Sequence, residues 1–223
     1  MELNEATKLH NRKRLCASYL KLQSEDAFLD LGSGESGELL NHALSADCRF
    51  VLAIDIDSTK LMRARNRSGP DAHFVRASGT NLPLRERTFD KIAMIEVLEH
   101  LPKGKEVESL REISRVLNDR GKLFVSTPNR FLPFTMLDPA FVFGHRHYSA
   151  PVVAAALVAG GLRPVYIGTY GGTAEAILTP AFYLMRRLRS NLYQMPQSML
   201  RKVDQEYGSP RARGYTLVAD CVK

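Results

Sequence analysis

The sequence predicts an α/β fold in which a doubly wound, mostly parallel sheet is covered by helices. Three observations predict it. Short apolar runs alternate with helical patterns along the 223 residues, a glycine-rich loop follows the first run, and an acidic residue ends the second. Alternation of this kind builds parallel sheets with helices on both faces. The length suits one domain, residues 1–223.

Seven segments are predicted as strands, most of them short apolar runs typical of strands buried on both faces. They are Ala27–Leu31, Phe50–Asp55, His73–Arg76, Lys91–Ile95, Lys122–Thr127, Arg163–Thr169 and Tyr215–Val222. Helical patterns lie between them at Glu38–Leu44, Ser58–Ala64, Val107–Leu117 and Ala150–Ala159. Asp57 precedes the second of these helices and is predicted to cap it.

Two further helical regions lie outside this alternation. Residues 1–24 contain an amphipathic helix, Glu5 to Leu22, that we expect to pack on the sheet. Residues 171–212 form a helical insertion between the last two strands, with Thr179 as helix cap and Pro180 as the first helical position. Its apolar residues fall on one face and its arginines off it. The pattern fits a lid that packs on the domain or a helix lying on a membrane surface.

Composition narrows the class of protein. Hydrophobic residues make up 44%, no apolar run reaches the length of a membrane span, and the first twenty residues lack a secretory signal's apolar stretch. The three cysteines follow no ligand spacing, so we expect buried thiols in a reducing cytoplasm. A net charge of +7 favours phosphorylated substrates, nucleic acid or an anionic membrane as partners, unless it is only a solvated basic surface.

The loop after the first strand, Gly32 to Gly37, decides between two kinds of ligand. In dinucleotide enzymes a G-x-G-x-x-G loop holds a pyrophosphate against a helix N-terminus. Here Asp30 ends the preceding strand and Glu35 lies within the loop. Each carboxylate would repel a nearby phosphate by on the order of 1–4 kcal/mol. A cationic ligand turns this repulsion into attraction, and S-adenosylmethionine (SAM) carries a sulfonium and an ammonium but no phosphate.

Four segments carry a family resemblance because they follow one another in a fixed order. They are FLDLGSGES, AIDID, LPLRERTFDKI and GKLFVSTPN. Together they resemble the class I SAM-dependent methyltransferases over Ala27 to Leu162, and among these the ubiquinone and menaquinone type that acts on small molecules. The resemblance implies a seven-stranded sheet whose last strand is antiparallel.

The resemblance also implies which residues hold SAM. Asp30, Gly32, Ser33 and Gly34 would line the methionine part, Asp55 would hold the ribose, Ile56 would pack on the adenine, and Ser78 and Gly79 would meet the adenine edge. Glu96 would lie beside the sulfonium. Two positions depart from the family pattern, since the third glycine is Gly37 rather than residue 36 and Ser78 replaces an acid. A hydroxyl accepts the adenine amine less strongly than a carboxylate, so weaker cofactor binding is expected.

Catalytic candidates follow the fourth and fifth strands. In EVLEHL, Glu96 lies three residues before Glu99 and four before His100, so a helix there would place them on one face. His147 follows in GHRHYS, together with His145. Methyl transfer needs an aligned nucleophile and, for a hydroxyl, a base. Glu96, His100 and His147 are therefore the predicted catalytic residues.

A metal site is an alternative use of the same side chains. E-x-x-E-H with a later histidine resembles the metal site of small-RNA 3′-end methyltransferases, and also the cation-dependent O-methyltransferases of the ubiquinone pathway. Glu96, Glu99, His100 and His147 would then bind Mg²⁺ or Mn²⁺. EVLEH also occurs widely in class I methyltransferases that hold no metal. The apolar segment between Phe131 and His145 is expected either to wall a hydrophobic pocket or to be core.

Four functions follow, in decreasing order of support. The first is methyl transfer from SAM to a small or amphiphilic, lipid-like acceptor, at oxygen or carbon rather than nitrogen, with peripheral membrane contact as a further expectation. RNA or protein methylation is second, favoured by charge and opposed by the lack of a separate nucleic-acid module. An NAD-dependent oxidoreductase and a non-catalytic SAM-binding protein complete the set.

Overall fold

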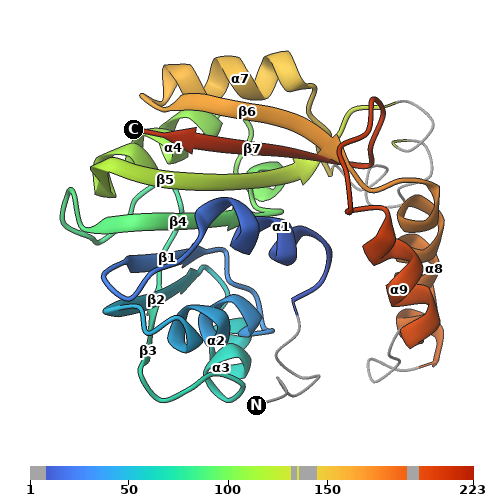
Figure 1. The fold of residues 1–223 in the computed structure, drawn as a ribbon, viewed down its shortest axis with the longest axis horizontal. Coiled ribbons are helices and arrows are strands. Elements are labelled where there is room, and N and C mark those ends of the chain that lie inside the picture. Colours follow the sequence, from blue (N-terminus) through green and yellow to red (C-terminus); the bar gives the residue numbers. More distant parts are fainter. Residues whose placement is uncertain (1–8, 132–134, 136–144, 190–195) are drawn as a thin grey trace.

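A seven-stranded sheet with the order β3-β2-β1-β4-β5-β7-β6 runs through the computed structural model (Figure 1). The structure describes residues 9–131, 135, 145–189 and 196–223. The strands are β1 (Ala27–Leu31), β2 (Phe50–Asp55), β3 (Ala72–Arg76), β4 (Phe89–Ile95), β5 (Leu117–Pro128), β6 (Arg163–Tyr170) and β7 (Thr216–Val222). Neighbours among β1 to β5 pair in parallel, and β7 is antiparallel to both β5 and β6. The predicted sheet and its antiparallel last strand are confirmed.

Helices cover both faces of this sheet. They are α1 (Asn11–Leu20), α2 (Glu38–Ser45), α3 (Ser58–Arg65), α4 (Glu106–Val116), α7 (Ala150–Ala159), α8 (Thr173–Arg189) and α9 (Gln197–Gln205). Because successive strand side chains point to opposite faces, Leu29 enters the core beneath α4 and α7, whereas Phe28 enters the core beneath α1, α2 and α3. Both are fully buried, and burial of each stabilises the fold by about 1.5–3 kcal/mol. All three cysteines are free thiols; Cys16 and Cys221 are buried in these cores.

The first helix begins later than the sequence predicts. α1 starts at Asn11, and residues 9 and 10 are not helical, so the predicted start at Glu5 is wrong over the described part. The backbone N–H of Asn11 donates to Asp204 at 2.7 Å, and the His10 ring lies 3.2 Å from the same carboxylate. The chain is thereby fastened to α9 where a longer helix would have continued. α1 still packs on the sheet as expected, through Leu15, Cys16 and Leu20.

The helical insertion lies between β6 and β7 as predicted, but its first helix starts at a different residue. α8 begins at Thr173, so the predicted cap at Thr179 is wrong and Pro180 falls inside the helix. The backbone N–H groups of Ala174 and Glu175 each donate to the Glu206 carboxylate at 3.0 Å. The cap therefore comes from the end of α9, which no local pattern reveals. Most of the predicted apolar face of this helix lies outside the described side chains. None of the described helices is long and apolar enough to cross a membrane.

Candidate functional site

The glycine loop turns the chain from β1 into α2. Gly32, Gly34 and Gly37 have φ of +73°, +63° and +67°, a region that glycine enters without steric cost. The Gly32 N–H donates to the Ile54 carbonyl at 2.7 Å, which fastens the loop to β2. A Cβ on Gly32 would lie 2.2 Å from the Val97 side chain, whereas one on Gly34 would meet nothing within 4 Å. The loop is thus packed beneath Gly32 and open above Gly34.

Asp55 joins this loop to the end of β2. Its carboxylate accepts the N–H of Gly34 at 2.9 Å through one oxygen and the N–H of Asp57 at 2.9 Å through the other. A carboxylate offers about four acceptor sites, so the capacity to accept ligand hydroxyls remains. Asp57 caps α3, as predicted, by accepting from the backbone of Thr59 and Lys60. These backbone hydrogen bonds hold the pKa of Asp57 below its usual value.

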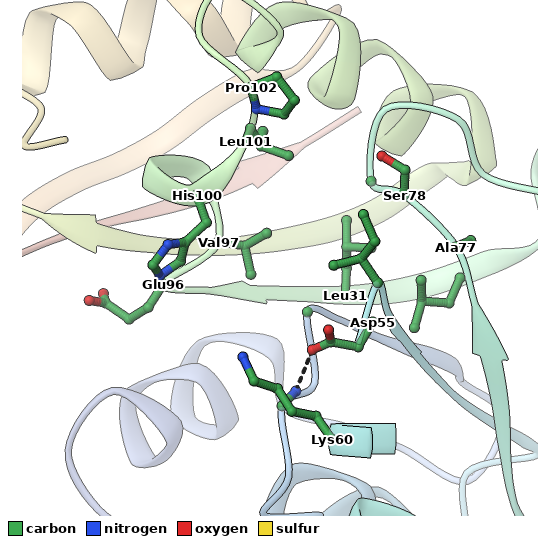
Figure 2. A pocket seen from close by; sticks show the side chains of 15 residues that line it. Leu31, Asp55, Lys60, Ala77, Ser78, Glu96, Val97, His100, Leu101 and Pro102 are labelled. Carbon is green, nitrogen blue, oxygen red and sulfur yellow. Dashed lines mark hydrogen bonds between the residues drawn. The ribbon is translucent and has the colours of Figure 1, made fainter. Parts of the chain in front are cut away.

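A cavity of about 470 Å³ opens between the loop, the end of β2 and the segment after β4 (Figure 2). Of the predicted site residues, those that line it are Gly32, Gly34, Asp55, Ile56, Ser78, Gly79, Glu96 and His100. Ile56 lines the cavity and is 65% exposed, so its side chain offers an apolar surface to a flat ligand. Lys60, Leu101 and Pro102 also line the cavity and were not singled out from the sequence.

Asp30 and Ser33 are not among the residues that line the cavity. Asp30 is buried on β1, and its burial raises the pKa of the carboxyl to about 7, against the opposing charge of Lys13. The Ser33 hydroxyl is buried and has no hydrogen-bond partner among the described residues. A cation bound near Asp30 would favour its ionised form, and a polar ligand could satisfy Ser33. These features, with the open face of Gly34 and exposed Ile56, fit SAM.

Ser78 closes its own turn rather than presenting an unengaged hydroxyl. Its Oγ lies 2.9 Å from the Thr80 hydroxyl and accepts the Thr80 N–H at 3.3 Å. Gly79 follows, and a Cβ there would lie 3.3 Å from Ser109 Oγ. Both residues line the cavity. The Ser78 hydroxyl, which was expected to contact the adenine edge, therefore already has a hydrogen-bond partner in Thr80.

The segment EVLEHL does not form the helix that its spacing suggested. Glu96 has φ of +54°, and only Leu98–His100 form a single 3₁₀ turn. A left-handed residue turns the chain sharply, so Glu96, Glu99 and His100 do not share one helical face. Glu96 accepts from the Ser126 hydroxyl at 2.9 Å, whereas Glu99 is buried and accepts from the Thr127 hydroxyl at 2.9 Å. His100 and Glu96 both reach the cavity.

Glu99, His100 and His145 form a compact group whose ligand atoms lie within 4.8 Å of one another. The Nε2 atoms of His100 and His145 are 3.4 Å apart, and Glu99 Oε1 lies 3.8 Å from His145 Nε2. Glu99 Oε1 is buried and has no hydrogen-bond partner in the described part of the chain. Burial, and then the charge of Glu96, raise the pKa of Glu99 well above its usual value. Two imidazoles and an unsatisfied carboxylate oxygen fit a divalent transition-metal ion.

His147 lies outside that group. Its Nδ1 is 3.3 Å from the Asn129 carbonyl and 3.3 Å from the Thr135 hydroxyl. The structure thus brings His145, rather than His147, beside His100. Both histidines stand in GHRHYS, two residues apart, and only the path of the chain distinguishes them. The apolar segment expected to wall a pocket lies, apart from residue 135, outside the described residues.

Arg146, between these histidines, was not identified from the sequence. Its guanidinium donates to the backbone carbonyls of Glu99, Leu98 and Leu101 and pairs with Glu106. It therefore holds the turn that carries Glu99 and His100. A lone arginine in a loop gives no local signal for such a role. Arg12, on α1, lies 3.2 Å from Glu96, and no local pattern signals this pair because the two residues are far apart in the chain.

Sheet order, the antiparallel last strand and a cavity at the carboxyl ends of β1, β2 and β4 define the class I methyltransferase fold. A solved SAM-dependent methyltransferase from Mesorhizobium loti has the same fold, with a TM-score of 0.66 at 16% identity over 94% of this chain and 96% of that one. Residues 29–125 match the methyltransferase domain family. The resemblance to SAM-dependent methyltransferases that the four segments carried is thereby confirmed.

Two relatives extend this comparison. A protein of Mycobacterium tuberculosis named as a probable SAM-dependent methyltransferase is 31% identical over 135 residues, which is 60% of this chain and 47% of the relative. A ubiquinone biosynthesis O-methyltransferase of Xylella fastidiosa is 35% identical over 113 residues, 49% of this chain and 44% of the relative. The chain spans about half the length of the curated relatives that it matches.

Proposed function

We propose that the protein transfers a methyl group from SAM to a small or amphiphilic acceptor. The observation that carries this proposal is that Gly34, Asp55 and Ile56 line the same cavity as Glu96 and His100. The first group suits the nucleoside, and the second suits the reacting end of the cofactor. Methyl transfer is an in-line displacement, so alignment of the acceptor against the sulfonium is the main task of the protein.

The candidate site residues divide into two roles under this proposal. Those at the loop and strand ends hold the cofactor: Asp30, Gly32, Ser33, Gly34, Asp55, Ile56, Ser78, Gly79 and Glu96. His100, at the wall of the same cavity, receives the proton of a hydroxyl acceptor. His147 lies further off, on the Asn129 carbonyl, and its proposed part is to orient the acceptor side.

The acceptor class rests on weaker support. The name of the Xylella relative describes methylation of oxygen in ubiquinone biosynthesis, which favours an oxygen atom of an amphiphilic molecule. The net charge of +7 and the helical insertion suit an acceptor at a membrane surface, with the protein in the cytoplasm. Methylation of RNA or protein is the alternative that the same charge supports.

Calorimetric titration with S-adenosylhomocysteine (SAH) tests the cofactor proposal directly. NAD serves as the control ligand, because the oxidoreductase alternative predicts that NAD binds in place of SAH. Saturable binding of SAH without NAD binding is the expected result. Binding of NAD alone, or of neither ligand, would refute the proposal. Positive binding would be followed by an acceptor panel of phenols, amphiphilic quinol precursors and RNA, with SAH release as the readout.

As the alternative to proton transfer by His100, we propose a divalent cation on Glu99, His100 and His145, since an imidazole nitrogen that binds a metal cannot also accept a proton. Their donor set, two imidazoles and one carboxylate, suits Mn²⁺ better than Mg²⁺, since Mg²⁺ prefers oxygen ligands. When bound, such an ion would polarise acceptor oxygens. Mn²⁺ binding is measured by electron paramagnetic resonance on the wild type, His145→Ala and His147→Ala. Loss of binding in His145→Ala alone is expected; loss in His147→Ala alone, or no binding in the wild type, would refute this ligand set.

A further inference from the structure

The carboxylate of Glu96 is held at the cavity by groups from distant parts of the chain. Glu96 directly follows β4 and has a left-handed backbone conformation, which is costly for any residue except glycine. Its backbone N–H donates to the Ser126 carbonyl at 3.0 Å, and its Oε1 accepts the Ser126 hydroxyl at 2.9 Å. The same oxygen lies 3.2 Å from Nε of Arg12, which comes from α1.

Arg12 is in turn fixed on its other side. Its terminal nitrogen donates to Glu175 of α8 at 2.5 Å, and its Nε lies 3.2 Å from the Thr216 hydroxyl of β7. Only about a fifth of its side chain is exposed, and Glu175 is 1% exposed. Burial would lower the pKa of Arg12, but Glu175 and then Glu96 hold that pKa well above its usual value. Arg12 therefore stays charged between two acids.

The helical insertion holds Glu175 at this position. The Tyr207 hydroxyl, just beyond α9, lies 2.8 and 2.7 Å from the two Glu175 oxygens and 2.8 Å from the Thr216 hydroxyl. Gly171, at φ +73°, provides the space that the Glu175 carboxylate occupies, because a Cβ at this position would be 2.1 Å from Glu175 Oε2. Figure 1 shows α8 and α9 side by side, on the side of the molecule toward which the carboxyl end of β5 points. A continuous set of hydrogen bonds thus runs from the insertion to the cavity wall.

We propose that Arg12 is a positioning residue that holds the Glu96 carboxylate at the cavity, with Glu175 and Tyr207 of the insertion holding Arg12 in turn. This inference rests on the proposed function, because Glu96 matters there as the carboxylate beside the sulfonium. A buried ion pair contributes little net stability compared with apolar side chains of the same volume. The contacts of Arg12 instead support a geometric role, in which the ion pair fixes the Glu96 carboxylate in one orientation.

Arg12→Lys separates geometry from charge. Lysine keeps the positive charge but is a point donor, and it cannot span Glu96, Glu175 and Thr216 as the guanidinium does. We expect SAM to bind about tenfold more weakly to Arg12→Lys than to the wild type, which corresponds to about 1.4 kcal/mol. Arg14→Lys is the matched control, because Arg14 lies on the same helix and pairs with Asp204, away from the cavity. Its affinity should equal that of the wild type.

A double-mutant cycle distinguishes positioning from a general structural effect. In a Glu96→Gln background, Arg12→Lys should change SAM affinity less than twofold, because there is no longer a carboxylate to position. An equal loss in both backgrounds, or no loss in the wild-type background, would overturn the proposal. If Arg12→Lys does not fold, Glu175→Gln takes its place in the same cycle, since it keeps the shape of the acid and removes its charge.

A crystal structure of Arg12→Lys without ligand makes the outcome independent of cofactor binding. The Glu96 carboxylate should leave the Ser126 hydroxyl, and an unchanged Glu96 side chain would overturn the proposal. If the wild type binds no SAM, the proposed function fails by itself. The position of Glu96 in the variant crystal would still decide whether Arg12 fixes it.

Discussion

The N–H of Gly34 donates to the carboxylate of Asp55 at 2.9 Å, so the glycine loop after β1 is tied to the acid that ends β2. The two residues are 21 positions apart and meet because β1 and β2 are parallel neighbours. A ligand seated over the loop is therefore within reach of the carboxylate.

Replacement of Asp55 by alanine should weaken SAH binding by about 1–3 kcal/mol, because a charged hydrogen-bond acceptor is lost. Calorimetry measures the affinity, and chemical denaturation measures the accompanying loss of stability. Asp57→Ala is the matched control, since Asp57 caps α3 and does not line the cavity. This substitution should lower stability, because the capping hydrogen bonds of α3 are lost, and it should leave affinity unchanged. Equal affinity of Asp55→Ala and the wild type would remove Asp55 from the ribose site.

Asp30 should make the stability depend on pH. Its folded-state pKa is raised to about 7 from 3.8, so this acid is protonated in the folded state at pH values where the unfolded chain has released its proton. Stability is thus lost as pH rises from the unfolded to the folded pKa. The wild type should lose on the order of 2 kcal/mol of its free energy of unfolding between pH 5 and pH 8 through this group, and Asp30→Asn should not show this loss. Urea denaturation at both pH values checks this, with exposed Asp71→Asn as control.

The same acid should release a proton when the cofactor binds. The ammonium of SAH lowers the pKa of a nearby carboxyl, so binding near pH 7 shifts Asp30 to its ionised form. Calorimetry in two buffers with different ionisation enthalpies gives the number of protons released. We expect a fraction of one proton for the wild type and none for Asp30→Asn. Identical values for the two proteins would show that Asp30 does not sense the ligand.

Gly32→Ala should destabilise the protein more than Gly34→Ala. Both residues have positive φ, which costs an alanine about 1–2 kcal/mol. Only at Gly32 would the new methyl collide with Val97, at 2.2 Å, and crowding of this kind adds about 1–3 kcal/mol. Thermal or urea unfolding measures the difference. Gly34→Ala should instead weaken SAH binding, because its methyl enters the open side of the loop; a larger stability loss at Gly34 would contradict this geometry.

His100→Ala should lower turnover more than cofactor affinity, because the imidazole lines the cavity near the proposed acceptor position. Turnover is followed as SAH release with the acceptor that the panel identifies, and affinity by calorimetry. His73→Ala serves as control, since His73 is exposed on β3 and stacks on Phe50. An unaltered rate in His100→Ala would exclude His100 as a catalytic residue.

Local sequence patterns were enough to predict the sheet and the glycine loop that lines the cavity. Apolar runs such as Phe50–Asp55 mark strands buried on both faces, and Gly32 and Gly34 mark a turn that needs positive φ. Once strands β1 and β2 are parallel neighbours, their carboxyl ends must meet at one edge. Each of these signals depends only on residues that are close together in the chain, so it can be recognised from the sequence alone.

The sequence by itself therefore determined the fold class, the glycine loop with Asp55, and the cap at Asp57. Tertiary structure alone decided that His145 rather than His147 meets His100, that Glu206 caps α8 and that Arg12 joins Glu96 to Glu175. The pair Arg12 and Glu175 is separated by 163 residues. Such contacts depend on how helices and loops pack on the finished sheet, and local periodicity does not contain the distances between segments that lie far apart in the chain.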